Sequence, residues 1–249
     1  MKNNLFIKKI VFERDKVSDF SKYPFSIPLL QNFYELEFST PVTFLIGENG
    51  IGKSTLIEAI ALHLGLSSES GTENFLYKSK DTHSSLYKYI TLHKSGLVPT
   101  TKYFLRAESF YNFSTEMQRL IEEDGYTSLS NYYGGKLHEC SHGEAFLKVV
   151  QNRFSDGGLY ILDEPEAALS PSRQMSLLCM IDNLAKNGSQ FIIATHSPIL
   201  ISYQNGTILD LNQDFKEVDY KETEIYETYK LFLDNPEKMQ EYLFLKEEE

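Results

Sequence analysis

The chain has 249 residues, of which 41% are hydrophobic, and its formal net charge is −11. A chain of this size can bury one large core, and we expect a single α/β domain over residues 1–249. The acidic balance argues against broad, nonspecific binding of nucleic acid, which depends on neutralising phosphates with Lys and Arg.

The remaining composition indicates a cytoplasmic protein. Two cysteines provide no disulfide framework. No apolar run approaches the roughly 20 residues that span a bilayer, and the first residues lack a signal-peptide pattern. We therefore expect no direct membrane insertion.

The N-terminal segment predicts strands over 5–12 and 33–38. A short apolar run at 42–46 predicts the next strand, and 54–64 predicts a helix. Between that strand and helix lies a glycine-rich segment that matches G-x-x-x-x-G-K-[ST] at every fixed position. Its residues are Gly47, Glu48, Asn49, Gly50, Ile51, Gly52, Lys53, Ser54 and Thr55.

This segment is the phosphate-binding loop of a nucleoside triphosphate site. Its glycines let successive backbone N–H groups converge on an anion, and the helix that follows directs its positive end at the phosphates. Lys53 is expected to neutralise the β- and γ-phosphates, and Ser54 to offer its hydroxyl to Mg²⁺. ATP and Mg²⁺ are thus the expected cofactors.

Residues 66–105 form an insertion after this helix. It carries five lysines against three acids, together with Tyr77, Tyr87, Tyr89 and Tyr103. Basic residues interleaved with tyrosines are a weak version of a nucleic-acid surface, and a solvated excursion without a ligand is the favoured explanation.

Two later strands each end in polar residues. The strand over 159–162 leads into Asp163 and Glu164, which we interpret as a metal-side carboxylate and a catalytic base, although a solvated strand end would look the same. The strand over 191–194 leads to His196, which could reach a γ-phosphate. Ser141 is a suitable N-cap for a helix that includes 144–150, and 171–186 predicts a second amphipathic helix.

In their order and spacing these segments resemble the ATP-binding-cassette (ABC) ATPases. The residues that carry the resemblance are the loop 47–55, Ser141-His142-Gly143-Glu144, Leu162-Asp163-Glu164-Pro165 and Ala194-Thr195-His196-Ser197. Among these ATPases the chain is most similar to soluble AAA-labelled proteins related to the heads of SMC and recombination-repair proteins. It has no coiled-coil arms.

The resemblance implies a P-loop NTPase fold with a mixed sheet and flanking helices. It also implies that Ser141, Gly143 and Glu144 contact ATP held by a second copy, in a head-to-tail homodimer. Phe12, Tyr23 or Phe25 could stack on adenine or pack in the core. This sequence departs from the family at Cys140 and His142, where transporter subunits have Leu and Gly. Their Q-loop glutamine is also missing, and Glu108 or Ser109 could replace it.

Two other patterns have alternative explanations. His138, Cys140 and His142 are potential zinc ligands, but no fourth ligand accompanies them, and the signature loop already accounts for this segment. Cys179 is expected in the core. Residues 213–249 carry twelve acids and five lysines, with apolar residues at helical spacing, and predict a helical segment that docks on the core or on a partner.

These features predict a Mg²⁺-dependent ATPase acting with a protein partner, in nucleic-acid maintenance or defence. A second hypothesis is an ATP-gated interaction module with very slow turnover. A third is the ATPase subunit of a membrane transporter.

Overall fold

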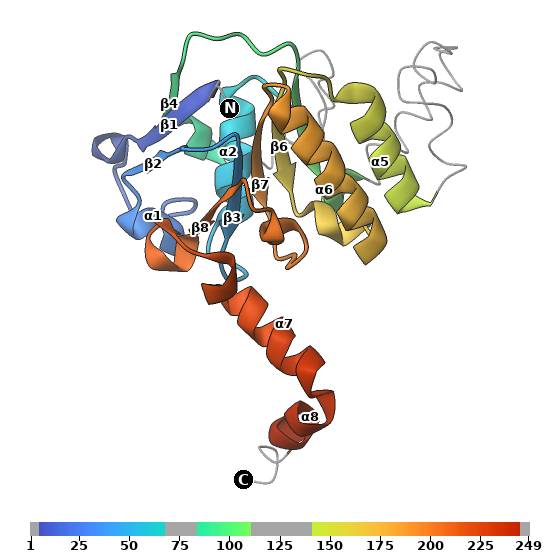
Figure 1. The fold of residues 1–249 in the computed structure, drawn as a ribbon. Coiled ribbons are helices and arrows are strands. Elements are labelled where there is room, and N and C mark those ends of the chain that lie inside the picture. Colours follow the sequence, from blue (N-terminus) through green and yellow to red (C-terminus); the bar gives the residue numbers. More distant parts are fainter. Residues whose placement is uncertain (1–4, 68–83, 111–140, 245–249) are drawn as a thin grey trace, which may run out of the picture.

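The fold is known from a computed structural model that describes residues 5–67, 84–110 and 141–244 (Figure 1). A six-stranded sheet has the order β5-β6-β7-β3-β8-β9, and a three-stranded antiparallel sheet has the order β2-β1-β4. All neighbours in the larger sheet are parallel except β8 and β9, so that sheet is mixed, as the sequence predicts. The strands of the larger sheet are β3 (Val42–Ile46), β5 (Lys102–Arg106), β6 (Leu159–Asp163), β7 (Gln190–Ala194), β8 (Thr207–Asp210) and β9 (Lys216–Glu217).

Alternate residues of the central strands face opposite apolar clusters, as the two-residue period of a strand requires. Leu45, Ile161 and Ile192 belong to one cluster, and their neighbours Phe44 and Tyr160 belong to the other. Helix α2 (Lys53–His63) packs in the first cluster, and α5 (His142–Arg153) and α6 (Pro171–Lys186) pack in the second. Both faces are thus covered, which explains the continuous apolar runs of these strands.

The N-terminal strands form their own sheet rather than extending the central one. It consists of β1 (Ile7–Phe12), β2 (Glu35–Glu37) and β4 (Ile90–Lys94), with the short α1 (Pro28–Asn32) after β1. The buried side chain of Gln190 joins the two sheets, because its oxygen accepts from the N–H groups of Phe6 and Ile7 at 2.8 and 2.9 Å. Residues of this smaller sheet share the first apolar cluster with α2.

The described part of the 66–105 insertion is built into the fold. It supplies β4, and Tyr87 and Tyr89 pack on the first cluster, while Tyr103 is fully buried. These three tyrosines therefore do not form an exposed stacking surface, and Tyr77 lies outside the described residues.

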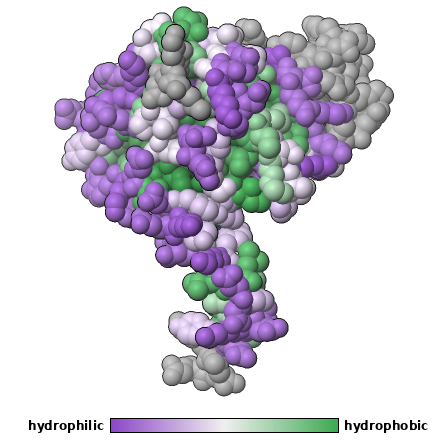
Figure 2. All heavy atoms as spheres, viewed as in Figure 1, coloured by the Kyte–Doolittle hydropathy of each residue, from purple (hydrophilic) through white to green (hydrophobic). Residues whose placement is uncertain are grey.

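The C-terminal segment is helical but does not dock on the core as a whole. Helices α7 (Glu224–Asp234) and α8 (Pro236–Phe244) extend away from the rest of the chain (Figure 1). Ile225 packs on the second cluster, whereas Leu231 and Leu233 are 61% and 71% exposed. Figure 2 shows hydrophobic and hydrophilic residues together along this pair of helices. We call α7 and α8 the C-terminal arm.

Candidate functional site

The loops after β3, β6 and β7 meet at the carboxyl edge of the central sheet. The register aligns the carboxyl ends of neighbouring strands, because Arg106 pairs with Asp163, Asp163 with Ala194, and Leu45 also with Ala194. The glycine-rich loop after β3, the acids after β6 and His196 after β7 are therefore neighbours. Ligands of parallel α/β sheets bind beyond this edge.

The glycine-rich loop has a backbone that side chains would strain. Gly50 and Gly52 have φ angles of +83° and +119°. A Cβ atom on Gly52 would lie 2.7 Å from Ile27 Cδ1 and 3.2 Å from Leu29 Cβ. Ile51 lies within the same turn, and its carbonyl accepts from the N–H of Leu29 at 3.1 Å. Glycine at position 52 thus provides both a conformation and a close approach.

Helix α2 begins at Lys53, and no side chain caps it. The amides of its first turn, which includes Ser54 and Thr55, are thus available to an anion. The Lys53 ammonium lies over the loop and donates to the carbonyl oxygens of Gly47 and Glu48 at 2.8 and 2.9 Å. Burial lowers the pKa of Lys53, and the nearby carboxylates of Glu164, Asp163 and Glu166 oppose that shift.

The two residues predicted to hold Mg²⁺, Ser54 and Asp163, are in contact. Ser54 Oγ donates to Asp163 Oδ1 at 3.1 Å, and Arg106 Nε donates to Asp163 Oδ2 at 2.9 Å. Burial raises the pKa of the Asp163 carboxyl, and the adjacent Arg106 opposes that shift. A cavity of about 420 Å³ adjoins them, lined by Ser54, Arg106, Ala107, Glu108, Asp163, Glu164 and Ala167. Glu108, a predicted substitute for the missing glutamine, thus lines the same cavity as Ser54 and Asp163. Ser109 instead donates to the carbonyl of Arg106 at 3.4 Å.

The backbone of Glu164 is unusual for a residue other than glycine. Its φ is +48°, in the left-handed region, and its N–H donates to the carbonyl of Ala194 at 2.9 Å. Such conformations are concentrated at functional sites. The side chain is 41% exposed, and a carboxylate oxygen lies 3.9 Å from His196 Nε2.

Glu166, which the motifs do not predict, holds His196 in place. The backbone N–H of His196 donates to Glu166 Oε1 at 2.5 Å. Burial and the nearby Lys53 ammonium lower the pKa of His196, and burial raises that of Glu166. Among the described residues, His196 Nε2 has no hydrogen-bond partner, so a ligand could supply one. An acid two residues after Glu164 was the available signal for Glu166.

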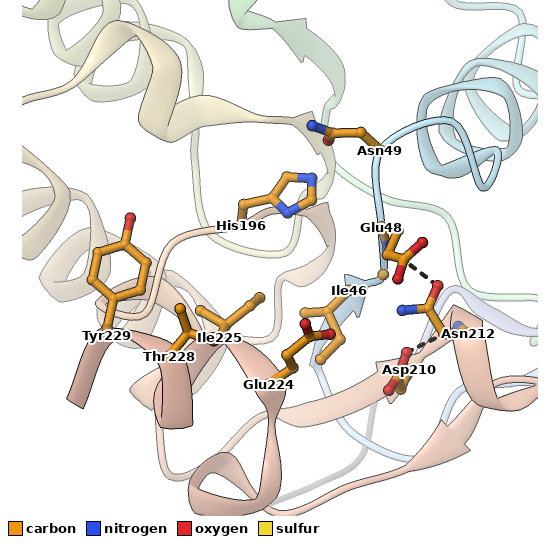
Figure 3. A pocket seen from close by; sticks show the side chains of 11 residues that line it. Ile46, Glu48, Asn49, His196, Asp210, Asn212, Glu224, Ile225, Thr228 and Tyr229 are labelled. Carbon is orange, nitrogen blue, oxygen red and sulfur yellow. Dashed lines mark hydrogen bonds between the residues drawn. The ribbon is translucent and has the colours of Figure 1, made fainter. Parts of the chain in front are cut away.

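A second cavity, of about 340 Å³, lies beside the glycine-rich loop (Figure 3). Asn49 and His196 line it together with residues of α7, including Ile225 and Tyr229. On its other side Asn212 Oδ1 accepts from the N–H of Glu48 at 3.2 Å. The start of the C-terminal arm therefore borders the phosphate-binding loop.

The predicted signature residues begin α5. Ser141 is the N-cap of a reciprocal capping box with Glu144, and Arg173 Nη1 donates to Ser141 Oγ at 2.9 Å. Arg173 also pairs with Glu144 at 3.0 Å. A Cβ atom on Gly143 would lie 2.8 Å from the carbonyl oxygen of Ala168. The loop is thus braced by α6 and by the segment after β6, on the face of the sheet opposite α2.

Other predicted roles have different outcomes. Phe12 and Phe25 are buried core residues whose ring centroids lie 6.4 Å apart, whereas Tyr23 is 64% exposed. Cys179 is exposed, so the prediction of a core cysteine was wrong; it lies on the outer side of α6. His138 and Cys140 of the zinc hypothesis lie outside the described residues.

Within the described ranges, no helix is long and apolar enough to cross a membrane. In the same ranges, no group of three or more His, Cys, Asp or Glu residues could hold a metal ion. A Mg²⁺ site of the type expected here, with a hydroxyl and water among its ligands, does not require such a group.

Family models and a solved structure match this chain. Residues 18–142 match a family model described as "AAA domain". Residues 147–202 match a second model, described as "AAA domain, putative AbiEii toxin, Type IV TA system". The SMC head domain from Thermotoga maritima is 17% identical, with a TM-score of 0.42, and the match covers 82% of this chain and 95% of that chain.

Curated relatives include ATP-binding proteins of transporters. The vitamin B12 import ATP-binding protein BtuD of Yersinia enterocolitica is 30% identical, with 64% of this chain and 70% of that protein covered. The ribose import ATP-binding protein RbsA of Bacillus cereus is 25% identical, and the match covers 68% of this chain but only 37% of RbsA. Because an AAA model covers half of the chain and BtuD is similar over most of its length, the chain belongs to the AAA-domain family of ABC-type ATPases.

Proposed function

We propose that this chain is a single ATPase domain that hydrolyses ATP with Mg²⁺ at composite sites between two copies arranged head to tail. The observation that carries the proposal is the meeting of Ser54, Asp163, Glu164 and His196 at one sheet edge. The glycine-rich loop adjoins them and presents an uncapped helix N-terminus.

The residues present fit Mg²⁺, a hard cation that prefers oxygen ligands. The Ser54 hydroxyl and the carboxylates of Asp163, Glu164 and Glu108 line one cavity. Ser54 would hold the ion directly, and Asp163 would accept from its water. When bound, Mg²⁺ would neutralise charge on the phosphate oxygens.

Three residues would act on the phosphates and water. Lys53 would exchange its contacts with loop carbonyls for phosphate oxygens, because an ionic partner binds an ammonium more strongly. Glu164 would accept a proton from the attacking water. The neutral imidazole of His196 would donate a hydrogen bond to the γ-phosphate, with its backbone fixed by Glu166.

The position of the predicted signature loop supports the proposed dimer. Ser141 and Glu144 bond to Arg173 and to each other, with Gly143 between them, and α5 lies on the opposite face of the sheet from α2. The capping box occupies the N–H groups of Ser141 and Glu144, so an anion would be held here by the positive end of the α5 dipole and by the Ser141 hydroxyl. In a head-to-tail pair, this N-terminus would reach the ATP held by the partner's phosphate-binding loop.

A second candidate function, an ATP-gated interaction module, is supported by the C-terminal arm. Tyr229 lines the cavity beside the phosphate-binding loop, and Leu231 and Leu233, farther along the arm, are largely exposed. Nucleotide binding could therefore change the position of the arm and recruit a protein. The names of BtuD and RbsA suggest a transporter subunit as an alternative. Cys140 and His142 argue against it, because they depart from the transporter signature.

A mixing experiment tests the composite site. Ser141→Arg places bulk and charge at the interface and should abolish hydrolysis while its monomer still binds ATP. Lys53→Ala should remove ATP binding. A mixture should recover activity, because a heterodimer of the two contains one site with an intact loop and an intact signature.

Ser141→Ala is the matched control for the lost helix cap, which contributes about 1 kcal/mol to stability. It should be destabilised like Ser141→Arg without excluding the partner. A mixture no more active than its separate components, despite heterodimers detected by cross-linking, would argue against the composite site.

A further inference from the structure

Arg106 is a charged residue of the site to which neither the matched motifs nor the proposed chemistry gives a role. It ends β5 and pairs in register with Asp163 on the adjacent strand. Its side chain is only 17% exposed. A guanidinium at this depth needs partners for its donors, because burying an unpaired charge is strongly unfavourable.

Arg106 bridges two carboxylates from different elements. Nε donates to Asp163 Oδ2 at 2.9 Å, and Nη1 donates to Glu58 Oε2 at 3.0 Å. Glu58 lies on α2, one turn after Ser54, and its other oxygen accepts from the N–H of Ser84 at 3.0 Å. Arg106 thus connects the metal-side strand to the helix that carries the phosphate-binding loop.

These contacts restrain both oxygens of Asp163. Oδ1 accepts from Ser54 and Oδ2 from Arg106, so rotation of the carboxylate would break one bond or the other. The fork of the guanidinium can serve two acceptors in fixed directions, whereas the compact ammonium of lysine cannot reproduce that geometry. Burial alone would lower the pKa of Arg106, but Asp163 and Glu58 raise it, so the cation is permanent.

We propose that Arg106 is a positioning residue that fixes Asp163 against Ser54 and thereby couples Mg²⁺ binding to ATP binding. The inference rests on the proposed function, because it requires a Mg²⁺ ion at Ser54 and Asp163. Because Arg106 also bonds to Glu58 on α2, it holds the Asp163 carboxylate in a constant position relative to the phosphate-binding loop.

The test measures the affinity of the 249-residue chain for a fluorescent ATP analogue in Mg²⁺ and in EDTA. The dissociation constant in EDTA divided by that in Mg²⁺ reports how much Mg²⁺ strengthens binding of the analogue. In Arg106→Gln this ratio should fall about tenfold, since a hydrogen bond to a charged group is lost, while affinity in EDTA stays within about threefold. Arg106→Lys should lose most of the ratio although it keeps the charge.

Arg14→Gln is the control for loss of an arginine elsewhere. Arg14 donates to the carbonyl of Leu30 at 2.7 Å, away from Asp163, and its variant should keep the wild-type ratio. Glu58→Gln should reduce the ratio less than Arg106→Gln, because Arg106 would still hold Asp163. If Arg106→Gln fails to fold, Arg106→Lys carries the test.

The outcomes separate this inference from the proposed function. A wild-type ratio in folded Arg106 variants would overturn the inference alone. Equal loss of affinity in Mg²⁺ and EDTA would also overturn it, because that result indicates a general structural role. If wild-type protein itself binds the analogue equally with and without Mg²⁺, the proposed Mg²⁺ chemistry fails as well.

Discussion

Gly52→Ala should destabilise the protein more than Gly50→Ala. Both glycines have left-handed φ angles, +119° and +83°, and an alanine there costs about 1–2 kcal/mol. At Gly50 the new methyl group would meet nothing within 4 Å, whereas at Gly52 it would lie 3.2 Å from Leu29 Cβ. Ile27 can rotate away but Leu29 Cβ cannot, so overpacking adds about 1–2 kcal/mol at position 52 only.

The assay is equilibrium urea unfolding without nucleotide. Both substitutions change the entropy of the unfolded chain similarly, so this contribution cancels when the two are compared. The free energy of unfolding should fall by about 2–4 kcal/mol for Gly52→Ala and about 1–2 kcal/mol for Gly50→Ala. Equal losses, or a larger loss at position 50, would refute the packing described here.

Further predictions concern the proposed reaction. Lys53→Ala should lose ATP binding in calorimetry with an unchanged circular dichroism spectrum; retained affinity would contradict its phosphate role. Glu166→Gln should lower kcat more than it raises KM, because the N–H of His196 loses a charged acceptor, and equal effects on both would contradict this. Arg173→Ala should slow hydrolysis without weakening ATP binding by the monomer; unchanged turnover would dismiss its bracing role. The lowered pKa of His196 keeps its imidazole neutral, so activity attributable to His196 should persist below pH 6.5. If lowering the pH reduces wild-type activity before pH 6.5 is reached, and His196→Ala shows no such reduction, the result would contradict this.

The local elements of the central fold follow directly from the sequence. The predicted helix 171–186 coincides with α6, and the apolar runs before the glycine-rich loop and before Asp163 coincide with β3 and β6. Proline at the start and an Asn-Gly pair at the end delimit α6. Strand pairing between sheets could not be predicted, because it depends on distant contacts such as that between Gln190 and β1.

The motifs also did not predict the positioning residues of the site. Glu166 and Arg106 act through partners 30 and 57 positions away in the chain, His196 and Asp163. The exposure of Cys179 was misjudged because the apolar face of α6 is narrow and is centred on Leu177, Ile181 and Leu184. The spacing of apolar residues predicted the helix α6, but only its packing against the sheet shows which side of the helix is buried.

Sedimentation velocity of Glu164→Gln tests the central claim most directly. The amide keeps the size of the side chain but cannot accept a proton from water, so ATP should bind and persist. With Mg²⁺ and ATP the variant should sediment as a dimer, and with ADP or without nucleotide as a monomer. A monomer under all conditions, together with full wild-type ATPase activity at concentrations where no dimer is detected, would contradict the composite site.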